Sequence, residues 1–119
     1  MYKKILVTLE NSRTDAAILE HIKPLAQLLK CELLLVHVAD GWAARHQEEL
    51  DLSESQEMKE DRAYLGAVRA VLEEAGIATQ TLLLCGEPAD EIIKIARAEA
   101  VDLIAMSTHG HRFLSDMIY

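Results

Sequence analysis

Cysteine, basic residues and long hydrophobic runs are all scarce in this sequence of 119 residues. Its two cysteines, Cys31 and Cys85, lie far apart without CxxC spacing, and reduced thiols in a cytosolic protein are the simplest account of them. The net charge of −8 argues against a nucleic-acid scaffold, because phosphate binding needs clustered lysine and arginine. No apolar run is long enough to span a membrane, and the apolar part of the N-terminal MYKKILVTLE is too short for a signal peptide.

Glycine is missing from the positions that the common phosphate-binding loops require. The segment after the first apolar run, residues 10–14, contains no glycine, which argues against a GxGxxG dinucleotide loop, and no GxxxxGK[ST] motif occurs anywhere. Ser107 has no GxSxG context, so a nucleophile elbow is not supported. The His109 and His111 pair lacks the further ligands of a closed metal site. We therefore expect no catalytic residue and no bound metal of the protein's own.

Short apolar runs alternate with helical patterns along the chain. Runs at 4–9, 32–38, 78–84 and 102–106 predict strands, and apolar residues at helical spacing predict helices over 15–30, 57–75 and 90–100. The near-continuous apolar character of ELLLVHV is typical of a strand buried on both faces. This order predicts an α/β fold with a parallel sheet and right-handed crossovers.

Several residues mark expected boundaries or irregularities in these elements. Pro24 falls inside the first helix and should kink it or remove a hydrogen bond. Gly86 should end the third strand, and Pro88 suits the first turn of the helix that follows. Residues 39–56 lack clean periodicity and predict a long, partly ordered excursion, in which Trp42 covers either a ligand or partner, or simply the core.

Polar residues follow the first and last predicted strands. Residues 107–112 form a polar loop with one glycine before a final helical pattern, which is either a phosphate site or an ordinary turn between strand and helix. Glu10 stands at the tip of the first strand, where a carboxylate accepts hydrogen bonds from a sugar hydroxyl or an amine, or is simply a solvated loop acid. His37, within an apolar strand, is expected to be a satisfied core or rim histidine.

Four stretches, in the right order and spacing, resemble the universal stress protein family over essentially the whole chain. KILVTLENS is similar to the family's opening KILVPVDGS, and ELLLVHV to its second strand. CGEPADEII resembles the GxPAxxI turn, and DLIAMSTHGHRFLSDMIY resembles the signature DLIVMGTHGRxGLxxLLLG. The resemblance implies an open, doubly wound parallel sheet of the adenine nucleotide alpha hydrolase-like, Rossmann-like three-layer type. It also implies one domain over residues 1–119, with the family's last strand outside this sequence.

The resemblance also implies a nucleotide site, with departures from the family's pattern. Nucleotide-binding members carry Gly-x2-Gly-x9-Gly-(Ser/Thr), whose backbone amides hold the phosphates of ATP. Here Ser107 occupies the first glycine position and narrows the approach of a ligand, although its hydroxyl can supply a hydrogen bond. Gly110 keeps the second position, and the third falls just after Tyr119.

The nucleoside half of the implied site maps onto the first two strands. The family's strand-one aspartate corresponds to Glu10, and its nearby proline to Thr8. Val38 matches the position whose backbone meets adenine in relatives that bind ATP. The candidate nucleotide-binding residues are Thr8, Leu9, Glu10, Val38, Met106, Ser107, His109, Gly110, His111 and Arg112.

Two functions are consistent with these residues. The first is a cytoplasmic regulatory domain of the stress response that binds ATP, or ADP or AMP, with or without Mg²⁺, hydrolyses it slowly if at all, and forms a homodimer. The second is a family member that has lost nucleotide and acts through dimer or partner contacts, as the changes at Thr8, Glu10 and Ser107 suggest. A flavodoxin-like or response-regulator domain is a weaker reading, because the clustered acids and the expected lysine are missing. We expect no nucleic-acid or membrane partner.

Overall fold

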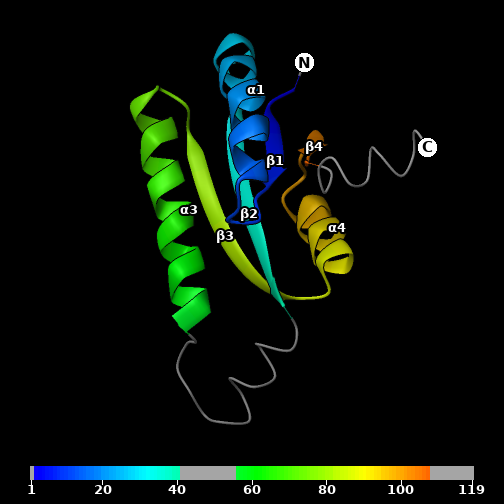
Figure 1. Cartoon of the computed structure of the whole chain (residues 1–119). Coiled ribbons are helices and arrows are strands. Elements are labelled where there is room, and N and C mark those ends of the chain that lie inside the picture. The colour runs from blue at the N-terminus through cyan, green and yellow to red at the C-terminus, as the bar shows by residue number, and fades with distance from the viewer. Residues whose placement is uncertain (1, 41–55, 108–119) are drawn as a thin grey trace, which may run out of the picture.

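A parallel four-stranded sheet forms the centre of the structure, a computed structural model that describes residues 2–40 and 56–107 (Figure 1). The strands are β1 (Lys4–Thr8), β2 (Glu32–Asp40), β3 (Thr79–Gly86) and β4 (Leu103–Ala105). The helices of the described residues are α1 (Thr14–Leu29), α3 (Gln56–Glu74) and α4 (Pro88–Ala98). The alternating order of strands and helices that the sequence predicted is therefore confirmed.

The strand order is β3-β2-β1-β4, and all three pairings are parallel. Successive strands move away from β1 to β2 and β3, and β4 then returns to the other side of β1. In right-handed crossovers this reversal places the connecting helices on opposite faces. Helices α1 and α3 accordingly lie side by side on one face and α4 lies on the other, which gives three layers (Figure 1).

Side chains of the two central strands alternate between the two faces of the sheet. Ile5 and Val7 pack with α1 and α3, whereas Leu6 between them packs with α4. All three are 0% exposed, so β1 is buried on both faces, as a near-continuous apolar strand requires. The burial of these residues holds the carboxyl end of β1 at a constant position relative to both helical layers.

Tertiary contacts set two of the element boundaries. Helix α1 continues through Pro24, which has no N–H to donate, because Ile18, Ile22, Leu25 and Leu29 pack against the core on both sides of the proline. The third strand was expected to stop at Leu84, but β3 continues to Gly86, its last residue, which pairs with Asp40. Helix α4 begins at Pro88 as predicted, and the Glu87 side chain caps it by accepting from the Asp90 N–H.

The expected excursion over residues 39–56 and the final helical pattern after residue 112 fall largely or wholly outside the described residues. Within those residues, no helix has both the length and the apolar character needed to cross a bilayer.

Candidate functional site

The predicted site residues that the structure describes lie at one edge of the sheet. Thr8 ends β1, with Leu9 and Glu10 directly after it, and Val38 lies near the end of β2. Met106 and Ser107 directly follow β4. The strands are parallel and in register, with Val7 opposite Ala105 and Thr8 opposite Val36, so these residues share the carboxyl edge. The remaining candidates, His109, Gly110, His111 and Arg112, lie outside the described residues.

The strand order reverses between β1 and β4, and this point is the usual ligand crevice of an open α/β sheet. The connection after β1 leads to α1 on one face, whereas the segment before β4 comes from α4 on the other. Glu10 and Ser107 therefore follow the two strands that border the crevice. The arrangement is that of a site built from the ends of β1 and β4.

The Glu10 side chain is half-buried and held by the first turn of α1. The Thr14 hydroxyl donates to Oε2 of Glu10 at 3.2 Å, and the hydroxyls of Ser12 and Thr14 lie 2.8 Å apart. An ionised carboxylate only accepts hydrogen bonds, so a ligand at Glu10 must bring a hydroxyl or an amine. The position suits a nucleoside and disfavours a phosphate.

The backbone amides after β1 are already used by a buried carboxylate, that of Asp15. Its Oδ1 accepts from the N–H of Glu10 at 2.9 Å, and its Oδ2 accepts from the N–H of Asn11 at 2.8 Å. Asp15 is 1% exposed and stands in the first turn of α1, where a negative charge complements the helix dipole. The N–H groups of Glu10 and Asn11 are therefore not available to bind a phosphate.

Two side chains of α3 complete a polar cluster beneath this connection. The Tyr64 hydroxyl donates to Oδ2 of Asp15 at 2.6 Å, and Asn11 Nδ2 donates to Oδ1 of Asp61 at 3.1 Å. Burial, and then the hydrogen bond to Asp15, raise the pKa of Tyr64, so that its hydroxyl stays a donor at neutral pH. Sequence reasoning missed Asp61 and Tyr64, whose spacing of three residues on a helix was the one available signal that they share a face.

His37 is a satisfied histidine, as its position in an apolar strand predicted. Its Nδ1 lies 2.7 Å from the carbonyl oxygen of Leu9, and its Nε2 lies 3.2 Å from Oδ2 of Asp61. Both ring nitrogens therefore face oxygen atoms, and the ring joins β2, the end of β1 and α3. Over residues 2–40 and 56–107, no cluster of three or more histidine, cysteine or acidic side chains could hold a metal ion.

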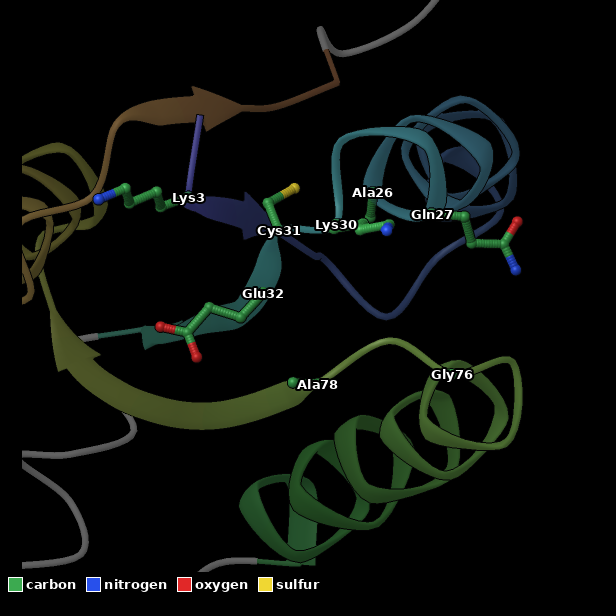
Figure 2. A pocket seen from close by; sticks show the side chains of 8 residues that line it. All are labelled: Lys3, Ala26, Gln27, Lys30, Cys31, Glu32, Gly76 and Ala78. Atoms are coloured by element: carbon green, nitrogen blue, oxygen red, sulfur yellow. The ribbon is translucent and has the colours of Figure 1, made fainter. Parts of the chain in front are cut away.

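A groove of about 620 Å³ lies at the opposite, amino edge of the sheet (Figure 2). It is lined by Lys3, Ala26, Gln27, Lys30, Cys31, Glu32, Gly76 and Ala78. Figure 2 shows the Lys3 side chain extending away from Gln27 and Lys30, so the two lysines do not converge on one point. The groove lacks the convergent polar groups of a ligand site.

The model of the universal stress protein family matches residues 1–119. The chain is similar to universal stress protein MJ0577 of Methanocaldococcus jannaschii, with 30% identity over 135 residues that cover 99% of this chain and 83% of that protein. The solved structure of hypothetical protein MJ0577 superposes with a TM-score of 0.76 and 33% identity, covering 94% of this chain and 78% of that one.

Two further solved structures share the fold at lower identity. A universal stress protein from Archaeoglobus fulgidus in complex with dAMP has a TM-score of 0.70 and 19% identity, covering 98% of this chain and 90% of that one. A universal stress protein in complex with cAMP has a TM-score of 0.65 and 17% identity, covering 95% of this chain and 82% of that one.

Proposed function

Because this chain belongs to the universal stress protein family, we propose that it is a regulatory domain of the stress response that binds an adenine nucleotide at the carboxyl edge of its sheet. The observation that carries the proposal is the division of that edge into two unlike halves. The β1 side carries the Glu10 carboxylate, and its backbone N–H groups donate to Asp15. On the β4 side, the polar segment begins at Ser107.

Each half of the site binds a different part of the nucleotide. The nucleoside contacts Thr8, Leu9, Glu10 and Val38, and the Glu10 carboxylate accepts hydrogen bonds from ribose hydroxyls or the adenine amine. Met106 and Ser107 begin the phosphate half, which continues outside the described residues with His109, Gly110, His111 and Arg112. Two universal stress proteins of the same fold were solved in complex with dAMP and cAMP, which supports an adenine nucleotide, and ATP with Mg²⁺ is the form we propose.

The nucleotide acts by binding rather than by turnover, with hydrolysis slow or absent. Regulation then requires that the two states of the protein differ in affinity for the nucleotide, so that ligand shifts their populations. We propose that these states differ in conformation or in homodimer formation, and that the protein works in the cytoplasm.

A family member that acts through protein contacts is the second candidate, and one observation favours it. Ile93 on α4 and Ile104 on β4 are 49% and 39% exposed and line one groove, and Met106 beyond β4 is 57% exposed. Within residues 2–40 and 56–107, β4 is an edge strand. An apolar edge of this kind pairs readily with another chain.

The deciding experiment is to purify the protein without added nucleotide, denature it and analyse the supernatant by chromatography with mass detection. We expect about one equivalent of adenine nucleotide, or binding of added ATP and Mg²⁺ by calorimetry. Empty protein with no heat of binding and no thermal shift would reject the proposal and favour the second candidate.

Two variants locate the site. Glu10→Gln should weaken nucleotide affinity by about tenfold, because a charge-assisted hydrogen bond becomes a neutral one, while the unfolding midpoint changes little. Glu20→Gln, an exposed acid on α1, is the matched control and should bind as the wild type does. Gly110→Val should abolish binding without lowering thermal stability, and unchanged binding would remove Gly110 from the site.

A further inference from the structure

The three residues after β1 are held by side chains from three different elements. The Leu9 carbonyl contacts His37 of β2, and the amides of Glu10 and Asn11 donate to Asp15 of α1. The Asn11 side chain donates to Asp61 of α3. The backbone of this segment is thus constrained residue by residue, although it is a connection and not a strand or helix.

Asn11 adopts a left-handed conformation, with φ of 61°. A residue other than glycine holds such a conformation only where its surroundings stabilise it, and asparagine tolerates it better than most. Here the surroundings are two buried carboxylates, Asp15 on its N–H and Asp61 on its side chain. Since Asn11 directly follows Glu10, the same contacts set the direction in which the Glu10 side chain leaves the sheet.

Both ring nitrogens of His37 lie within hydrogen-bonding distance of an oxygen atom, so each of the two contacts needs a hydrogen atom. The Leu9 carbonyl can only accept, so Nδ1 of His37 must carry a hydrogen. Nε2 then faces Oδ2 of Asp61 at 3.2 Å, which is a hydrogen bond only if a second proton sits on Nε2 or on the carboxylate. Without that proton, two lone pairs face each other in a site where the side chains of His37 and Asp61 are only 16% and 8% exposed.

The ionisable neighbours of this pair come from every element around it. Asp15 lies on α1 and shares Asn11 with Asp61, and Tyr64 lies on α3 and donates to Asp15. Glu10 stands in the connection itself, and Arg62, which is exposed, follows Asp61 in α3. Asp61 therefore belongs to a continuous set of hydrogen bonds that joins α1, α3 and the connection after β1.

We propose that Asp61 is a positioning residue whose contact with His37, together with its hydrogen bond from Asn11, holds residues 9–11 in the conformation that binds nucleotide. The inference rests on the proposed function, because the site whose conformation it describes is the nucleoside half of that site. Loss of the Asp61 carboxylate removes both contacts, releases Leu9 and Asn11, and weakens binding.

The test measures the Kd for ATP with Mg²⁺ by calorimetry at a single pH. In Asp61→Asn, the amide oxygen still accepts from Asn11, and the amide nitrogen can donate to Nε2 of His37. That conservative variant should bind within about twofold of the wild type.

Two further variants remove the contact itself. Asp61→Ala should bind about tenfold more weakly, the equivalent of one lost hydrogen bond to a charged group. Asn11→Gly keeps the left-handed φ and both backbone bonds to Asp15 but loses the link to Asp61, so it should weaken binding similarly even if Asp61→Ala folds poorly. Glu57→Gln, an exposed acid in the first turn of α3, is the control.

The outcomes separate the inference from the function on which it rests. Binding by Asn11→Gly and Asp61→Ala within twofold of wild type overturns the positioning role and leaves the proposed function standing. Binding by Asp61→Asn as weak as that by Asp61→Ala would also overturn the positioning role, because the asparagine side chain can keep both contacts. Wild-type protein that binds no adenine nucleotide overturns the proposed function, and the inference with it.

Discussion

The hydroxyl of Tyr64 lies 2.6 Å from Oδ2 of Asp15, although the two residues are 49 positions apart in the sequence. The hydrogen bond joins α3 to the first turn of α1, directly beneath the connection that follows β1. Asp15 in turn accepts the amides of Glu10 and Asn11, so one buried carboxylate links two helices to the candidate nucleoside site.

Tyr64→Phe should destabilise the protein by about 1–2 kcal/mol, because it removes one hydrogen bond to a charged group and leaves Asp15 with less than its full set of donors. Urea denaturation followed by circular dichroism measures the change, and Tyr2→Phe, at a tyrosine that is 45% exposed, is the control. Equal stability of the two variants would show that the Tyr64 bond contributes nothing net.

Two glycines should respond in opposite directions to alanine. Gly86 has φ of 137°, and an added Cβ would lie 2.9 Å from Oε1 of Glu91, so Gly86→Ala should cost about 1–3 kcal/mol. Gly66 lies inside α3, and an added Cβ there meets nothing within 4 Å, so Gly66→Ala should stabilise by about 0.5–1 kcal/mol. Thermal unfolding of both variants checks the prediction, and changes of the same sign would contradict it.

Acid should weaken the junction between β1 and β4. The Asp102 carboxylate accepts the amides of Lys3 at 2.7 Å and Lys4 at 2.9 Å, and these hydrogen bonds hold the pKa of Asp102 below its ordinary value of 3.8. The unfolded chain then binds the proton more readily than the folded one. The resulting stabilisation is present above that value and is lost as pH falls through the folded-state pKa.

Asp102→Asn should therefore be less stable than wild type at neutral pH, and the difference should shrink as the solution is acidified below about pH 4. Urea titrations at a series of pH values measure it. A difference in stability that stays constant from neutral pH to about pH 3 would show that the two amide bonds do not favour the charged carboxylate.

Cys31 should react slowly with thiol reagents in the folded protein. Its side chain lies at the start of β2 and the residue is 4% exposed, and burial is the main cause that raises the pKa of its thiol. The thiolate is the reactive form, so Cys31 in a Cys85→Ser variant should be modified at least about tenfold more slowly in buffer than in urea. Similar rates in the two solutions would place Cys31 on an accessible surface.

Short apolar runs and helical spacing were enough to predict the order of elements and the parallel sheet. This is because each pattern reports burial of a whole face, and a strand such as β1, buried on both sides, leaves a strong local signal. Single residues were less reliable guides to where an element ends. Packing on both sides of Pro24 lets α1 continue through the proline, and pairing with Asp40 extends β3 to Gly86.

The sequence by itself also determined that the residues after β1 and β4 share one edge, since parallel strands all end on the same side. Only the tertiary structure decided how that edge is built. It placed Asp61 and Tyr64 of α3 against Asn11 and Asp15, and His37 against both Leu9 and Asp61. No local pattern encodes these contacts, because they join polar side chains far apart in the chain, and those side chains meet only once the two helices have packed on the same face of the sheet.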